Sequence, residues 1–313
     1  MCYPCCVRQL EAVYAPSRAH FSNLLALAVV ATVMATLSFS PVSQAQQAEE
    51  DRFAAVAVSA QQVAGSVYML TGAGGNIAAS IGADGTLIVD DQFAPLHGRI
   101  QTVLDKLGGS KPKLILNTHY HGDHAGGNAL FGEAGTIIAH DNVRQRLLAD
   151  DELPRSALPV VTFGQHLQVH FNDETIRVMH LPSGHTDGDS AVWFVEANVI
   201  HMGDQLFNGR YPYVDAASGG SVDGYIANLA AILDQVPDDI QVIPGHGPLG
   251  GIEALREAHE LIAESVALIR EAQAQGRSDR RLIKQLDKRY PKAGSGFINA
   301  KRWVDIVRSS PQN

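Results

Sequence analysis

Three histidines and an aspartate lie close together in the segment Thr118–His124, which reads THYHGDH: His119, His121, Asp123 and His124. The segment follows the apolar run 113–116, KLIL, which is typical of a buried strand. Because side chains on extended backbone alternate between faces, His119 and His121 should point the same way from the strand end. A turn at the next glycine would let the other two residues supply a second pair of donors. Imidazole nitrogens and carboxylate oxygens suit zinc, and two pairs leave room for two ions. The alternative is a chance cluster of surface histidines.

Two further histidines and one aspartate stand in turns that follow apolar runs. His185 lies in PSGHTDG after the run TIRVMHL, His246 lies in PGHGP after IQVI, and Asp204 follows VIHMG. A single histidine in a turn is usually only solvated. The same pattern recurs here at several strand ends, so we expect each of these strands to deliver one ligand to the first cluster.

These seven residues, in this order along the chain, resemble the signature of the metallo-β-lactamase superfamily of hydrolases, over roughly Val67 to Pro248. The resemblance implies an α+β fold, a four-layer αβ/βα sandwich with two β-sheets face to face, helices outside and metals at one edge. It assigns His119, His121 and His185 to a first zinc ion. It assigns Asp123, His124 and His246 to a second, with Asp204 bridging both. Two Zn²⁺ per chain are expected, with iron or manganese as alternatives.

A dinuclear zinc hydrolase is the activity that this resemblance implies. A pair of zinc ions lowers the pKa of a bridging water from its bulk value toward about 7, and the zinc-bound hydroxide attacks a carbonyl carbon. Asp123 is the predicted catalytic residue, because it can orient the hydroxide and handle its proton. Asp204 favours a binuclear site, because one carboxylate can bridge two ions. Asp90, which ends a strand, is expected to accept the second N–H of a ligand imidazole.

We expect the substrate to be a small carboxylate-bearing amide, ester or thioester, with β-lactams among the candidates. Lactamases that use a cysteine ligand keep a lysine three positions later, where this chain has Phe207, and the nearest cation is Arg210. The bridging Asp204 is more similar to glyoxalase II-type thioesterases and lactone hydrolases, although their glutathione-binding C-terminal module is not recognisable. A mononuclear iron persulfide dioxygenase is a further alternative, which metal analysis would separate. A non-catalytic binding protein is disfavoured, because all seven ligands are present.

The N-terminal segment resembles a signal peptide. Arg8 and Arg18 precede the apolar stretch 24–39, and Ser43-Gln44-Ala45 is a small-x-small cleavage site. We expect residues 1–45 to be removed and the protein to be periplasmic or secreted, and a retained membrane anchor is the alternative. All three cysteines lie in this leader (Cys2, Cys5 and Cys6), so the mature chain has neither a disulfide nor a thiolate ligand.

The composition is that of an ordinary globular protein, with 313 residues of which 45% are hydrophobic and 18% charged. The net charge of −9 becomes −10 when the leader, with two arginines and one glutamate, is removed. Because the chain has no basic stripe, a nucleic-acid substrate is disfavoured. A small molecule is the expected partner, with no membrane contact after cleavage, and a homo-oligomer is left open.

The periodicity of apolar residues divides the chain into four parts. They are the signal peptide 1–45, a flexible lead-in 46–64, a catalytic domain 65–250 and a helical C-terminal extension 251–313. Three hairpins are predicted, with turns at 83–85, 172–173 and 196–198. Helices are predicted near 100–107, 141–149, 222–236, 252–274, 282–286 and 297–307, with Asp141 as one N-cap. His140 and His201 are expected near the ligands and Tyr120 is expected to pack. Whether the extension packs on the domain or contacts another subunit is left open.

Overall fold

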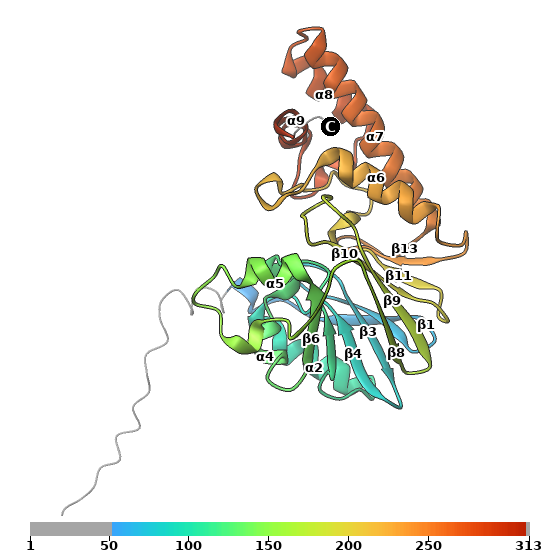
Figure 1. The fold of residues 1–313 in the computed structure, drawn as a ribbon. Coiled ribbons are helices and arrows are strands. Elements are labelled where there is room, and N and C mark those ends of the chain that lie inside the picture. The colour runs from blue at the N-terminus through green and yellow to red at the C-terminus, as the bar shows by residue number, and fades with distance from the viewer. Residues whose placement is uncertain (1–51, 311–313) are drawn as a thin grey trace, which may run out of the picture. The chain divides into compact units, whose positions relative to one another are not determined.

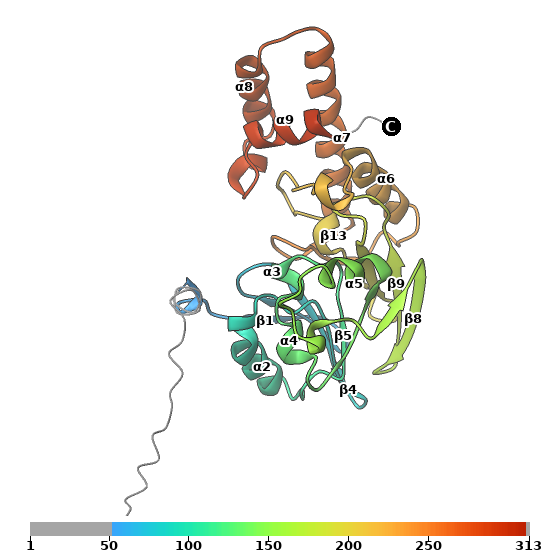
Figure 2. The same ribbon diagram turned by 60° about the vertical axis from the view of Figure 1, so that its left-hand side comes forward.

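A computed structural model describes residues 52–310, so the predicted signal peptide lies outside the described residues. In this part of the chain two β-sheets face each other and helices cover their outer faces (Figures 1 and 2). The expected α+β four-layer sandwich with a helical C-terminal region is therefore confirmed. None of the helices in the range 52–310 combines the length and the apolar character needed to cross a membrane.

The elements follow the predicted order. The first sheet has seven strands in the order of the sequence: β1 (Ser59–Ala64), β2 (Val67–Thr71), β3 (Ile77–Gly82), β4 (Gly85–Val89), β5 (Leu114–Leu116), β6 (Thr136–His140) and β7 (Val161–Phe163). The second sheet has six, in the spatial order β13 (Gly250–Gly251), β12 (Gln241–Ile243), β11 (Val199–His201), β10 (Ser190–Phe194), β9 (Glu174–His180) and β8 (His166–Phe171). The helices are α2 (His97–Lys106), α3 (Gly122–Ala125), α4 (Asn128–Phe131), α5 (Asp141–Leu147), α6 (Val222–Leu233), α7 (Ile252–Ala274), α8 (Asp279–Arg289) and α9 (Ala300–Ser309).

All three predicted hairpins form. β3 pairs with β4, β8 with β9 and β10 with β11, each antiparallel. The turn between β8 and β9 consists of Asn172 and Asp173, with φ of 55° and 62°. Two consecutive left-handed residues give the tight turn whose twist matches that of the flanking strands, and Asn and Asp tolerate this conformation.

Alternation along the strands divides the apolar side chains between two layers. Val67 and Met69 of β2 face the second sheet, where they belong to one core with Val178 of β9 and Val192 of β10. Leu70, the next residue of β2, faces the other way, into a core with the apolar side of α2. This period of two is what a sheet covered on both faces requires.

The strands that precede the predicted ligands end at the same edge. β4, β5 and β6 run parallel to one another in the first sheet. In the second sheet β11 is parallel to β12, and β9 has the same direction because both β9 and β11 are antiparallel to β10. The carboxyl ends of these strands carry the histidines and aspartates, so the topology brings the ligands to one edge.

Three local predictions are corrected. Residues 59–64 of the expected flexible lead-in form β1, whose backbone pairs with β2 although its sequence is polar. Edge strands need little apolar sequence, because backbone hydrogen bonds to the neighbour hold them. His140, not Asp141, is the N-cap of α5, since its ring accepts a hydrogen bond from Asn142 N. The helix 222–236 ends earlier, at Leu233.

The C-terminal extension packs on the domain. Apolar residues of α7, α8 and α9 form one core with α6 and with the outer face of the second sheet. Trp303 of α9 is fully buried in this core, where its indole N–H donates to Ser265 Oγ of α7 at 2.9 Å. The extension is thus part of the same folded unit as the strands that carry the ligands.

Candidate metal centre

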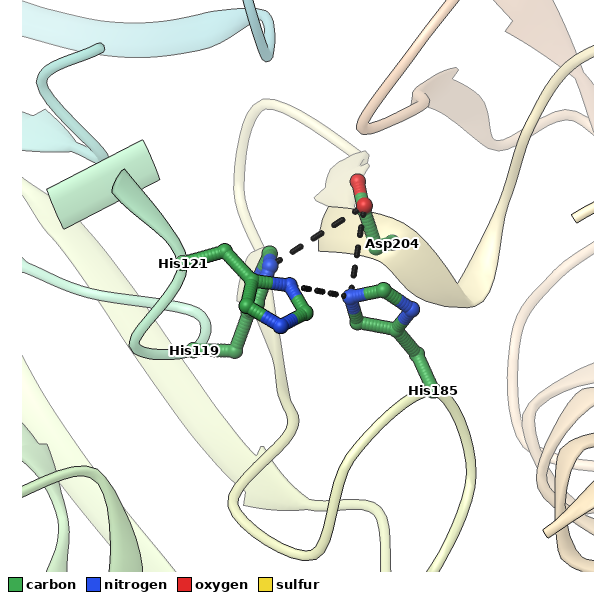
Figure 3. Close-up of side chains that lie close together, drawn as sticks. All are labelled: His119, His121, His185 and Asp204. Carbon is green, nitrogen blue, oxygen red and sulfur yellow. Dashed lines mark hydrogen bonds and ion pairs between the residues drawn. The ribbon is translucent and has the colours of Figure 1, made fainter. Parts of the chain in front are cut away.

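The seven predicted ligands converge in two groups. His119, His121, His185 and Asp204 form the first group, and Asp123, His124 and His246 form the second. Within each group the nearest ligand atoms lie within 4.8 Å of one another. Figure 3 shows the first group, in which His119 and His121 come from one loop and meet His185 and Asp204 from two other segments. The three donors that come late in the sequence therefore reach the early cluster.

Asp204 lies between the histidines of the first group and those of the second, with one oxygen facing each. Its Oδ2 is 3.4 Å from His185 Nε2 and 3.9 Å from His119 Nε2. Its Oδ1 is 3.0 Å from His124 Nε2 and 3.3 Å from His246 Nε2. The side chain is only 5% exposed, so these imidazoles are its main neighbours. A carboxylate in this position can bridge two cations.

In four of the five histidines, one ring nitrogen is engaged on the side away from the centre. His124 Nδ1 donates to Asp90 Oδ2 at 2.7 Å. His119 Nδ1 donates to Thr118 Oγ1 at 3.0 Å, and this hydroxyl in turn donates to Asp90 Oδ2 at 2.8 Å. One buried carboxylate thereby sets the tautomer of two ligands.

The other two histidines use different acceptors. His185 Nδ1 donates to the Tyr213 backbone carbonyl at 2.8 Å, and His121 Nε2 donates to Asp215 Oδ2 at 3.1 Å. Because a carbonyl and a carboxylate oxygen only accept, these nitrogens carry the protons. The remaining nitrogens, His185 Nε2 and His121 Nδ1, face each other at 2.8 Å. Two bare lone pairs repel at this distance, so the pair needs a shared proton or a cation beside it.

These residues fit metal ions. His119 Nε2 is buried and has no hydrogen-bond partner within residues 52–310, which is costly for a ring nitrogen unless something else binds it. Donors about 2.0–2.1 Å from a tetrahedral zinc ion lie about 3.3 Å apart. The separations between Asp204 and its imidazoles span 3.0 to 3.9 Å, close to this value. The nitrogen and oxygen donor set is also one that zinc accepts.

The charges within the centre shift its pKa values in opposite directions. Burial lowers the pKa of His185 to about 4, so this ring is neutral at neutral pH. Burial alone would lower the pKa of His246 too, but the Asp204 and Asp123 carboxylates raise it to about 9. Burial would raise the pKa of Asp204, but the surrounding imidazoles hold it well below its usual range. Metal binding would therefore displace a proton from His246.

Two glycines let the backbone approach the ligands closely. A Cβ on Gly75 would lie 2.2 Å from His124 Cε1, and a Cβ on Gly245 would lie 2.2 Å from Asp204 Oδ1. Both distances are far below van der Waals contact. Gly75 thus makes room for the His124 ring, and Gly245 makes room for the Asp204 carboxylate.

Comparisons with known proteins agree with this geometry. The family model described as the metallo-beta-lactamase superfamily matches residues 95–246. The chain is 23% identical over 167 residues to a metallo-beta-lactamase type 2 of Bacteroides fragilis, covering 53% of this chain and 66% of that protein. It is 32% identical over 136 residues to a hydroxyacylglutathione hydrolase of Polaromonas sp., covering 42% of this chain and 47% of that protein. The crystal structure of the DIM-1 metallo-beta-lactamase aligns with a TM-score of 0.58 and 19% identity over 67% of this chain and 99% of that one.

The chain belongs to the metallo-β-lactamase superfamily. It spans between about half and two thirds of the length of these two curated relatives. The metallo-β-lactamase fold accounts for the edge at which the ligands meet, and this chain supplies histidine or aspartate at all seven predicted positions.

Beside the two groups of candidate ligands lies a cavity of about 520 Å³. Asp123 and His246, with side chains 27% and 21% exposed, border it together with His121. The other walls combine aromatic rings and two arginines: Phe93, Phe207, Tyr213, Phe297, Arg52 and Arg210. An apolar cavity with a few polar groups at its base is the usual form of a small-molecule site.

The predictions for the surrounding residues have mixed outcomes. The role expected of Asp90 is confirmed by its contact with His124. Tyr120 does more than pack, because its hydroxyl lies 3.1 Å from Asp215 Oδ2. The prediction that His140 lies near the ligands is wrong, because its ring hydrogen-bonds to the Gly164 carbonyl and stacks on the His180 ring. His201 contacts the backbone just before Asp204, accepting a hydrogen bond from Gly203 N at 3.1 Å.

Sequence reasoning missed two partners of the histidines. Asp215 and the Tyr213 carbonyl orient His121 and His185 from a loop that has no recognisable motif. The one available signal was Asp215 itself, an acidic residue 11 positions after Asp204. This signal is weak, because isolated aspartates are common in loops. Phe297, from the C-terminal extension, was likewise not expected in the cavity wall.

Proposed function

We propose that the protein is a dinuclear zinc hydrolase that acts on a small carboxylate-bearing amide, ester or thioester. The observation that carries the proposal is the position of Asp204, with one oxygen toward each group of donors. This arrangement favours two ions over a single iron with two histidines and one aspartate. A mononuclear site would leave Asp123, His124 and His246 without a role, although they lie together beside Asp204.

When bound, a zinc pair supplies a Lewis acid and a water of lowered pKa. The chain's own residues set the conditions for that chemistry. Asp123 Oδ2 lies 3.4 Å from His246 Nε2 at the base of the cavity. Burial would raise the pKa of Asp123, but His124 and His246 lower it below its ordinary value, so this residue is an ionised carboxylate at neutral pH.

The substrate class rests on the cavity and on the relatives. Arg210, in the cavity wall, forms no ion pair with another residue of the described range and is available to bind a substrate carboxylate. Similar proteins include a metallo-beta-lactamase type 2, a hydroxyacylglutathione hydrolase and, at 27% identity over 47% of this chain and 61% of that protein, an acyl-coenzyme A thioesterase of Gallus gallus. Amide and thioester substrates are therefore both included. We also propose that the enzyme acts outside the cytoplasm, after removal of the signal peptide.

The test is turnover of a chromogenic cephalosporin and of a panel of thioesters and esters by the zinc-loaded protein, alongside metal analysis. We expect about two zinc ions per chain, and we expect Asp123→Asn to lower kcat/KM at least ~10²-fold, because it disturbs a ligand and the proton acceptor together. Asp151→Asn, an exposed aspartate outside the site, serves as a matched control that should retain full activity. Full activity of Asp123→Asn, or one iron per chain, would overturn the proposal.

A further inference from the structure

The C-terminal extension holds the loop 203–215, which carries Asp204 and several cavity residues. Tyr211 N in this loop donates to the Ala293 carbonyl at 3.0 Å. The Tyr211 ring stacks on Trp303 of α9, with centroids 5.6 Å apart and planes 15° apart. Both rings are buried, so the loop is fastened to the extension by packing as well as by a backbone hydrogen bond.

The same extension places the stem of Arg210. A Cβ on Gly296 would lie 2.8 Å from Arg210 Cδ, so the arginine stem lies directly against this glycine. A side chain at position 296 would push the guanidinium away from its present place in the cavity wall. Gly296 is followed by Phe297, which lines the same cavity.

Phe297 is an apolar ring that the fold leaves open to solvent. It is 71% exposed, whereas most large apolar side chains of the extension are buried. Arg302 covers it from one side, with its guanidinium carbon 4.3 Å from the ring centroid, and Tyr213 meets it edge to face at 6.2 Å. These contacts leave most of the Phe297 side chain exposed to solvent. Exposed apolar area of this size is unfavourable in water and is removed when an apolar group binds.

We propose that Phe297 and Tyr213 form a subsite for a planar apolar group of the substrate, beside Arg210 in the cavity that borders the metal centre. The inference rests on the proposed hydrolase function and narrows its substrate class. The substrate is an ester, thioester or amide that carries an aromatic or similarly flat apolar group in addition to its carboxylate. Phe297 is then a specificity-determining residue contributed by the extension.

The first test compares two thioesters of 3-mercaptopropionate, the acetyl and the phenylacetyl ester. They share the carboxylate and the leaving group and differ in the aromatic ring. We expect Phe297→Ala to lower kcat/KM for the phenylacetyl thioester about tenfold, equivalent to about 1.4 kcal/mol and expressed mainly in KM. Turnover of the acetyl thioester should stay within about twofold of the wild type, because the smaller acyl group does not reach the ring. Phe297→Leu, which is apolar but not planar, should give an intermediate value.

The second test needs no turnover. Binding of phenylacetate and of acetate to the same proteins is followed by NMR titration. We expect Phe297→Ala to weaken phenylacetate binding about fivefold or more and to leave acetate binding unchanged. Val160→Ala is the matched control, because Val160 is 72% exposed and does not line the cavity. Equal melting temperatures for the variants would exclude a general loss of structure.

The outcomes separate the two proposals. If Phe297→Ala affects both thioesters equally or affects neither, the subsite is refuted while the hydrolase proposal stands. If the wild type hydrolyses neither thioester, the titration decides the subsite by itself. A selective loss of phenylacetate binding would then support it, and unchanged binding would overturn it.

Discussion

Replacing Asp90 by Asn should weaken metal binding without disturbing the backbone. The carboxylate accepts hydrogen bonds from three donors: Thr118 N at 2.7 Å, Thr118 Oγ1 at 2.8 Å and His124 Nδ1 at 2.7 Å. An asparagine amide has the same shape but only one acceptor oxygen, so in either orientation one or more of these donors faces an N–H₂ group. With the amide nitrogen toward His124, the ring must move its proton to Nε2 and lose the lone pair that faces Asp204. Asp90 has a φ of 64°, and asparagine tolerates this left-handed conformation well.

The magnitude follows from the number of ligands that the carboxylate orients. Loss of such an orienting hydrogen bond typically lowers metal affinity about 10- to 100-fold, or about 1.4 to 2.7 kcal/mol. His124 loses its acceptor directly and His119 loses it through Thr118, so we expect the upper part of this range. The assay is a zinc titration in competition with a chromogenic chelator, which reports affinity and stoichiometry together.

Asp91→Asn provides a matched control one residue away. Asp91 is equally buried, and burial raises its pKa well above the usual value. Its Oδ1 accepts from Gly127 N at 2.8 Å, which an amide oxygen can also do. We expect zinc affinity to be unchanged in this variant. Wild-type affinity in Asp90→Asn, or equal losses in both variants, would refute the reasoning.

Three further predictions test other parts of the structure. Gly245→Ala should lower zinc affinity and activity at least tenfold (about 1.4 kcal/mol), because the new methyl group would displace Asp204. Gly98→Ala is the control and should have no such effect, because a Cβ at this position meets nothing within 4 Å. In chelator-treated protein, the pKa of His246 is about 9 in the folded state and 6.5 in the unfolded state. The protonated His246 ring therefore stabilises the fold fully below pH 6.5, and this stabilisation is lost as the pH rises to 9. The melting temperature of this metal-free protein should therefore fall between pH 7 and 9, by more than that of metal-free His246→Gln, and parallel curves would contradict the assignment. Trp303→Ala should lower the free energy of unfolding by about 3–5 kcal/mol, because the indole is fully buried. Urea denaturation measures this change, and a loss below about 1 kcal/mol would show that the extension contributes little to stability.

The sequence alone identified the seven candidate donors and most of the helices and strands. The identities and spacing of His119, His121, Asp123 and His124 follow from one strand and one turn, which are local features. The amphipathic pattern of 252–274 predicted α7 with its observed bounds. The hairpin turn at Asn172 was also predictable from local sequence, because Asn and Asp tolerate the left-handed backbone conformation that this turn requires.

Only the tertiary structure decided what surrounds these ligands. Asp215 lies 94 positions after His121, and the Tyr213 carbonyl 28 after His185, so neither hydrogen bond leaves a periodic signal in the sequence. β1 forms because β2 offers a free edge, not because its own residues favour a strand. Phe297 reaches the cavity because packing of α9 against α7 sets the path of the chain before it. Periodicity records which face of an element is buried, whereas contacts between distant segments depend on how whole elements pack, and that is why the wall of the cavity could not be read from the sequence.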